Sequence, residues 1–121
     1  MASISVVEPL AAIGVSNTLR SAIVGWAKTL ATETARDGIT VNTLLPGVIA
    51  TDRTVQMSRI AAERQKISIE EAIERTAQTI PVGRVGTAAE FGAVAAFLAS
   101  PLAAYVTGSL IRIDGGSLRS V

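Results

Sequence analysis

The segment from Ile39 to Leu45 constrains the fold of this chain more than any other. It is almost continuously apolar and rich in β-branched residues, and Pro46-Gly47 ends it. Strands of this composition are buried on both faces, as the strands of parallel sheets are. Parallel neighbours must be joined by a crossover, which is usually a helix. The segment therefore predicts an α/β fold in which helices cover a parallel sheet.

A long helix is predicted before this strand, over residues 13–36. Its apolar residues recur at spacings of three and four, which places them in one wide stripe. They are Val15, Leu19, Ala22, Ile23, Trp26, Ala27 and Leu30. The helix should end at Asp37-Gly38, because Gly readily adopts the left-handed conformation that closes many helices. Ahead of the helix, Ile4 to Val7 has the composition of the frayed end of a further strand.

The charge density rises over residues 51–80, where two helices are predicted. Ser68 followed by Glu71 is a capping box that opens the second of them, and Pro81 closes the segment. A second capping box, Thr87 with Glu90, opens another helix. The apolar residues of that helix form a stripe that should face the core: Phe91, Val94, Ala95 and Leu98.

The stretch from Phe91 to Ile111 contains 21 residues without a charge, and it has two interpretations. As one continuous helix it would be long enough to span a membrane. Ser100-Pro101 and Thr107-Gly108-Ser109 interrupt it, however, and favour a buried helix followed by a strand at Leu110 to Ile113. The order helix, strand, helices, strand then implies a parallel crossover in an open sheet.

The composition excludes several classes of function. The chain has no Cys and no His, which excludes disulfides, thiol nucleophiles, Ser-His-Asp catalysis and a metal site built on these residues. Eleven basic and ten acidic residues are dispersed, so no basic face for nucleic acid is expected. The first nine residues lack a secretory signal, which predicts a cytoplasmic protein. A length of 121 residues suits one domain.

Four stretches, in this order and spacing, resemble the C-terminal half of short-chain dehydrogenases/reductases. They are Ala27 to Glu33, Ile39 to Gly47 followed by Thr51, Ile80 to Gly86 leading to Glu90, and Val106 to Gly108 leading to Asp114-Gly115-Gly116. The resemblance implies a Rossmann-like, doubly wound parallel sheet whose first strands and Gly-rich loop are missing. Residues 1–121 would form a single partial domain, in which residues 51–80 correspond to the helical segment that covers the substrate.

In that family a Ser, a Tyr and a Lys perform the proton chemistry at the substrate oxygen. The resemblance places Ser3 at the Ser position, Ser16 at the Tyr position and Arg20 at the Lys position. A serine hydroxyl is a far weaker acid than a phenol, and arginine does not relay its proton. The other interpretation is that Ser16 caps the long helix and that Arg20 lies on its solvated or interface side.

The resemblance also implies a nicotinamide cofactor, NAD or NADP. Pro46, Gly47 and Thr51 would lie against its nicotinamide end, at the carboxyl edge of the sheet where open α/β folds bind ligands. Alternatively, the turn only ends the strand and Thr51 caps the next helix. No Gly-x-x-x-Gly-x-Gly turn follows a strand, so this chain alone is not expected to bind the cofactor.

Two functions follow from these observations. The first is an NAD(P)-dependent oxidoreductase acting on a carbonyl or alcohol, a 3-oxoacyl compound among the candidates, with Met57, Ile60 and Ile73 facing a small apolar pocket. The second is a truncated, non-catalytic member of the family that serves as an oligomerisation module. In both cases the resemblance implies a homo-oligomer through helix 13–36 and the C-terminal strand, with neither nucleic acid nor membrane as a partner.

Overall fold

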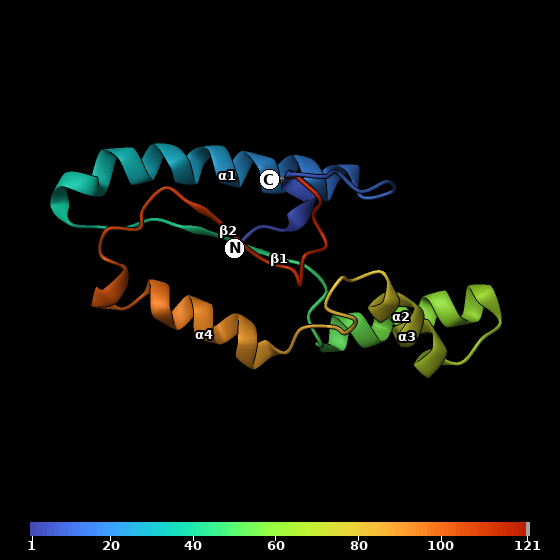
Figure 1. Ribbon diagram of the computed structural model, residues 1–121. Helices are drawn as coiled ribbons and strands as arrows, with labels where there is room; N and C mark the ends of the chain where they lie inside the picture. The colour runs from blue at the N-terminus through green and yellow to red at the C-terminus, as the bar shows by residue number, and fades with distance from the viewer. Residues whose placement is uncertain (121) are drawn as a thin grey trace.

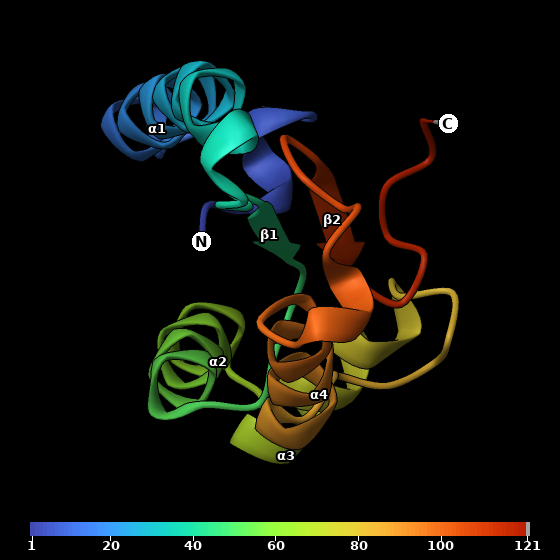
Figure 2. The same ribbon diagram turned by 90° about the vertical axis from the view of Figure 1, so that its left-hand side faces the viewer.

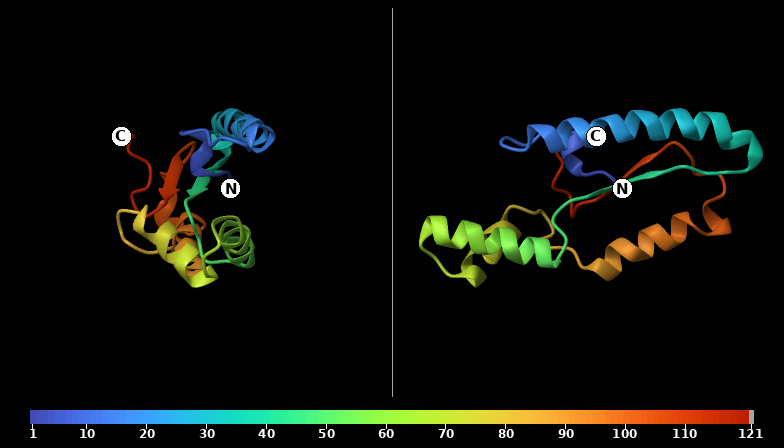
Figure 3. Two further views of the ribbon diagram at one scale, coloured as in Figure 1. Left: turned by 90° about the vertical axis from the view of Figure 1, so that its right-hand side faces the viewer. Right: turned by 180° about the vertical axis from the view of Figure 1, so that it is seen from behind.

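The computed structural model describes residues 1–120 and consists of a two-stranded parallel sheet between two layers of helices (Figures 1 and 2). Helix α1 covers one face of the sheet, and α4 lies on the other face (Figure 3). The helices are α1 (Gly14–Thr34), α2 (Asp52–Gln65), α3 (Ile69–Gln78) and α4 (Ala88–Leu98), the short 3-10 turns are η1 (Ile4–Val6), η2 (Ala35–Asp37) and η3 (Pro101–Ala103), and the strands are β1 (Thr43–Pro46) and β2 (Leu110–Ile113). The predicted α/β fold is confirmed.

The two strands pair in parallel, with Thr43 opposite Leu110 and Pro46 opposite Ile113. The connection between them contains α2, α3 and α4, as the predicted crossover requires. The uncharged stretch from Phe91 to Ile111 divides into most of α4, the turn η3 and the start of β2. No helix within residues 1–120 is both long enough and apolar enough to cross a membrane.

Strand β1 is shorter than predicted, because side chains replace the regular ladder at its start. The Asn42 amide donates to the Val106 carbonyl at 2.7 Å, and its oxygen accepts from the Ser109 N–H at 3.2 Å. The Val41 N–H donates to the Thr107 hydroxyl at 3.1 Å. These contacts hold the two segments together without strand geometry, so the extended chain begins to pair regularly only at Thr43.

The prediction of a third strand end at Ile4 to Val7 was wrong. This segment forms the 3-10 turn η1, whose N-cap is Ser3: the Ser3 hydroxyl accepts the Ser5 N–H at 3.1 Å. The sheet is extended on this side by one contact alone among residues 1–120, from the Ala2 N–H to the Leu44 carbonyl at 2.9 Å. The local Ser-x-Ser pattern favours a turn over a strand, because the hydroxyl satisfies a backbone donor.

The two predicted capping boxes differ in the structure. At α4 the box is complete: the Glu90 N–H donates to the Thr87 hydroxyl and the Thr87 N–H donates to the Glu90 carboxylate. At α3 only half of it forms, since the Ser68 hydroxyl accepts from the Glu71 N–H while the Glu71 carboxylate pairs with Arg75 at 2.8 Å. A helix-surface ion pair at this spacing competes with the cap for the same carboxylate.

The buried core is small and consists mainly of alanines, with Leu45 fully buried at its centre. The helix stripe predicted over residues 15–30 is divided by the fold. Ala27 and Ala31 are buried, whereas Val15, Leu19, Ile23 and Trp26 are between 47% and 78% exposed. The apolar face of α4 is only half-buried. The chain exposes 8211 Å², against about 6,200 Å² expected for a folded monomer of this mass.

The central position of Leu45 gives a test of the core. Leu45→Ala should lower the free energy of unfolding by about 2 to 5 kcal/mol, because it removes buried methyl groups and leaves a cavity. Leu102→Ala is the matched control, since Leu102 is 85% exposed and its truncation should change that free energy by less than about 0.5 kcal/mol. Urea denaturation measures both variants, and equal effects would contradict the described core.

The ion pair at the start of α4 predicts a pH dependence of stability. Hydrogen bonds from Arg84 and from Thr87 lower the pKa of Glu90 from 4.5 to about 2. The stabilisation from the ionised Glu90 is therefore complete above pH 4.5 and is lost as the pH falls through about 2. As the pH falls from 4.5 to about 2, the difference in urea midpoint between the parent and Glu90→Gln should therefore shrink. Glu63→Gln is the control, because the Glu63 carboxylate has no partner within residues 1–120. The difference in urea midpoint between the parent and this variant should not change with pH.

Candidate functional site

The carboxyl ends of β1 and β2 lie side by side and form the candidate site. The Gly47 N–H donates to the Ile113 carbonyl at 2.9 Å. A Cβ at Gly47 would lie 2.8 Å from both Cα and Cβ of Asp114, so only Gly permits this approach. The Asp114 carboxylate accepts the N–H groups of Gly116 and Leu118, both at 3.0 Å. This carboxylate therefore shapes the turn after β2.

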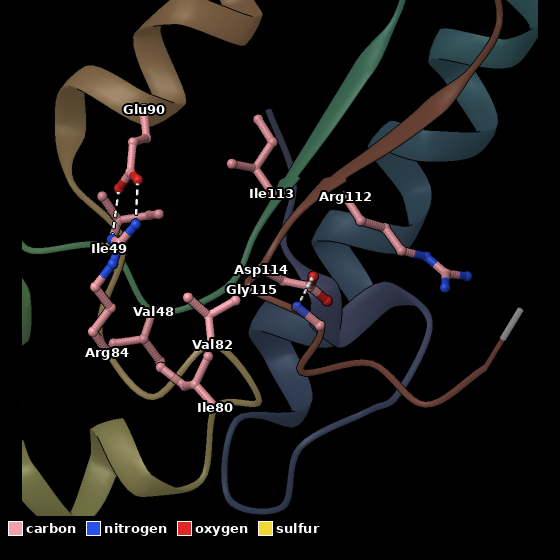
Figure 4. Close-up of a pocket in the computed structure, with 12 residues that line it drawn as sticks. Val48, Ile49, Ile80, Val82, Arg84, Glu90, Arg112, Ile113, Asp114 and Gly115 are labelled. Carbon is pink, nitrogen blue, oxygen red and sulfur yellow. Dashed lines mark hydrogen bonds and ion pairs between the residues drawn. The ribbon is translucent and has the colours of Figure 1, made fainter.

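A cavity of about 380 Å³ opens beside this edge (Figure 4). Apolar side chains form most of its wall: Val48, Ile49, Ile80, Val82 and Ile113. Arg84 and Glu90 lie at one side and form a two-pronged ion pair, with N–O distances of 2.5 and 3.0 Å. These two charges neutralise each other, whereas Arg112 and Asp114 add further charged groups to the largely apolar wall.

The turn after Pro46-Gly47 contains backbone N–H groups without a hydrogen-bond acceptor among residues 1–120. Within residues 1–120 the backbone N–H groups of Val48 and Ile49 donate to no acceptor. Thr51 is exposed and occupies the N-cap position of α2, but its side chain makes no capping hydrogen bond. The expectation that Thr51 is the N-cap residue of the next helix is therefore confirmed for its position, although its hydroxyl does not cap a backbone N–H. The sequence indicated this turn, but it could not show which backbone donors remain free, because their partners lie on other elements.

Ser16 and Arg20 contact each other at the start of α1. The Arg20 Nε–H donates to the Ser16 hydroxyl at 3.1 Å, and Nη1 donates to the Ala2 carbonyl at 2.6 Å. Ala2 precedes Ser3, so the structure brings the Ser16-Arg20 pair to the segment that holds Ser3. The N-cap of α1 is Ile13, and Arg20 is half-buried. The expectation that Ser16 caps the helix is therefore wrong, whereas the location of Arg20 on a solvated or interface side stays a prediction.

Two polar atoms near this pair have no partner, and the sequence did not single them out. The Ser5 hydroxyl and the Asn17 side-chain oxygen are buried without a hydrogen bond in the part of the chain that the structure describes. Ser5 is 1% exposed. Buried polar atoms are nearly always paired, so the fold leaves polar groups unsatisfied in the turn η1 and in the first turn of α1.

The apolar residues expected to face the substrate pocket do not line the cavity beside the carboxyl edge of the sheet. Helices α2 and α3 pack against each other as the predicted helical segment, but Met57, Ile60 and Ile73 are absent from the wall of the cavity. Met57 and Ile60 are 52% and 40% exposed. Residues 1–120 contain no group of three or more acidic side chains placed to hold a metal ion.

Comparison with known proteins supplies the family. The sequence profile described as "Enoyl-(Acyl carrier protein) reductase" matches residues 1–117. The NADPH-dependent reductase BacG of Bacillus subtilis is 42% identical over 114 residues, which cover 94% of this chain and 44% of BacG. The 3-oxoacyl-[acyl-carrier-protein] reductase FabG of Escherichia coli is 41% identical over 97 residues, which cover 80% of this chain and 35% of FabG.

The fold agrees with this relationship. The crystal structure of a short chain dehydrogenase family protein from Francisella tularensis superposes with a TM-score of 0.87 at 31% identity, covering 96% of this chain and 48% of that one. The chain thus spans less than half the length of each of these relatives. With its parallel sheet, its Pro-Gly turn and its matched length, the chain belongs to the short-chain dehydrogenase/reductase family and has part of that family's Rossmann-like α/β fold.

Proposed function

We propose that this chain is the substrate-side part of an NADPH-dependent oxidoreductase that reduces a carbonyl group or oxidises the corresponding alcohol. The observation that supports it most is the carboxyl edge of β1 and β2, with unpaired backbone donors beside an apolar cavity. Open α/β sheets bind cofactor and substrate at this edge. The name of BacG favours NADPH over NADH.

The residues of the Pro46-Gly47 turn fit the nicotinamide end of the cofactor. The free N–H groups of Val48 and Ile49 and the exposed Thr51 hydroxyl suit a planar amide with hydrogen-bond acceptors. The sequence contains no Gly-rich turn that opens a helix after a strand, so the pyrophosphate requires residues other than these. When bound, the cofactor supplies a hydride; this chain orients the substrate and holds the charge that develops on it.

Ser3 can donate to a substrate oxygen. Its hydroxyl accepts the Ser5 N–H at 3.1 Å, which leaves its own proton for an external acceptor. Ser16 and Arg20 can stabilise negative charge, but they are poor proton donors because serine is a weak acid and arginine retains its proton. We infer that proton delivery is the weak step of this site.

The substrate is proposed to be a compound of the 3-oxoacyl type or another small ketone. The apolar wall of the cavity suits an acyl chain, and FabG is named for reduction of 3-oxoacyl groups. Helices α2 and α3 would then act as the cover of the substrate, because they follow directly after the Pro46-Gly47 turn.

A second candidate function is that of an oligomerisation module without catalysis, which the exposed apolar surface favours. We propose a homo-oligomer whose contacts are the exposed α1 residues from Val15 to Trp26 and the region of β2, where Tyr105 and Leu110 are exposed.

Completing the sheet tests the enzymatic proposal. The part of BacG that precedes the matched residues is fused ahead of Met1, and consumption of NADPH is followed with ketone and 3-oxoacyl thioester substrates. Ser16→Tyr combined with Arg20→Lys should raise the rate at least ~100-fold over the parent fusion, a low contribution for a general acid. Ser16→Tyr alone should achieve less, because Arg does not reproduce the geometry of Lys.

The matched control is Thr32→Tyr with Arg36→Lys, an exposed pair at the same spacing. It should leave the rate unchanged. The unfused 121-residue chain should not alter NADPH fluorescence, because it lacks the phosphate-binding turn. A parent fusion as active as the double variant would refute the assignment of Ser16 as a defective donor, and fusions that fold without any NADPH consumption would overturn the proposed function.

Sedimentation velocity tests the oligomerisation proposal. Leu19→Lys, Trp26→Lys or Leu110→Lys should shift the chain towards the monomer, because each introduces a charge into an apolar contact. Val55→Lys is the control, since Val55 is exposed to a similar extent but lies on α2. A parent chain that is monomeric at every accessible concentration would contradict the proposal.

A further inference from the structure

Arg20 has more hydrogen-bond donors than the chain satisfies. A guanidinium carries five N–H groups. One donates to Ser16 and one to the Ala2 carbonyl, which leaves three without an acceptor within residues 1–120. The ion pairs of the described residues involve Arg75 and Arg84, so no carboxylate neutralises Arg20. A half-buried cation with free donors favours the binding of an anion.

The hydroxyls of Ser3 and Ser16 add hydrogen-bond donors near Arg20 and carry no negative charge. Ser16 accepts from Arg20, and Ser3 accepts from the Ser5 N–H, so the hydroxyl hydrogen of each serine remains unused within residues 1–120. Ser3 follows Ala2 directly, and the Ala2 carbonyl contacts Arg20 at 2.6 Å. Arg20 can only donate, and the two serines each have a hydroxyl hydrogen available for an acceptor.

The guanidinium is held in place before any ligand arrives. The Ala2 carbonyl that it contacts belongs to a residue that is 1% exposed, and the Ala2 N–H donates to the Leu44 carbonyl in β1. The second contact, to Ser16, lies on the same helix as Arg20 itself. A donor fixed from two sides loses little conformational entropy on binding, which favours recognition of a planar, charged group.

We propose that Arg20 and Ser16 bind a carboxylate of the substrate, which makes the substrate class a 2- or 3-oxo acid. The inference rests on the proposed function and names its substrate. Arginine pairs with carboxylates through charge-assisted hydrogen bonds. Ser3, adjacent to the Ala2 contact, would donate to the neighbouring carbonyl oxygen. A carboxylate is ionised at neutral pH, and Arg20 and Ser16 can donate hydrogen bonds to it without transferring a proton.

The test is an NMR titration of the 121-residue chain with pyruvate, without cofactor. Pyruvate at millimolar concentration should shift the backbone amide signals of Ser3, Ser16 and Arg20. Arg20→Gln should weaken binding roughly tenfold or more, because it removes a charge-assisted contact. Arg36→Gln, an exposed arginine on η2 with the same change of charge, should bind like the parent.

Ser16→Ala provides a second variant in case Arg20→Gln disturbs the N-terminal segment, since it keeps the Arg20 contact with Ala2. It should weaken binding by roughly threefold or more, the loss of one hydrogen bond. Methyl pyruvate, which lacks the charge, should not shift these signals. Absence of pyruvate binding, an equal response to methyl pyruvate, or unchanged binding in both variants would overturn the proposal.

An equal response to inorganic phosphate would also overturn it, because the site would then fit a phosphate of the cofactor rather than a substrate carboxylate. The outcome is independent of the fusion experiment. The titration contains no NADPH, so a failure here leaves the proposed reductase function standing. An inactive fusion, in turn, leaves the measured binding of the anion unaffected.

Discussion

The parallel pairing of β1 with β2 is the interaction on which the other parts of this structure depend. It joins two segments that are distant in the sequence, and contacts outside the ladder extend it at both ends. Asn42 bridges the segments before the strands begin, and Gly47 contacts Ile113 where they end. With the two carboxyl ends fixed side by side, the turns that follow them form one edge. The cavity, the free backbone donors and the Asp114 turn all lie along this edge.

Local signals in the sequence predicted most elements of the fold. The complete capping box at Thr87, the turn at Gly38 and the end of the strand at Pro46 depend on nearby residues, and each was found. Features that depend on distant partners were missed. The stripe on α1 resembled a core face because periodicity reports that residues are apolar, not what covers them. Strand β1 began later than predicted because Asn42 and Thr107 replaced backbone partners.

The hydrogen bonds of the candidate site residues likewise depend on distant partners. The resemblance selected Ser3, Ser16 and Arg20, but their hydrogen bonds could not be deduced, because Ala2 reaches Arg20 only through the folded N-terminal segment. The structure shows that Ser16 accepts and Arg20 donates, an arrangement suited to holding an anion. A tyrosine and a lysine at these positions would instead form a proton donor beside a flexible cation. Under the proposed assignment, Ser16 and Arg20 retain the positive charge at these positions but supply a weaker proton donor.

The edge of β1 that faces away from β2 has backbone groups that can pair with a further strand. Ala2 covers only part of that edge, since its N–H bond to the Leu44 carbonyl is the one backbone contact there among residues 1–120. Such an edge accepts any strand that arrives, whether from the correct partner or from another unfolded chain. Assembly and aggregation thus compete for the same hydrogen bonds. A strand that pairs with this edge, from the same polypeptide or from another one, ends this competition and adds hydrogen bonds that the small core lacks.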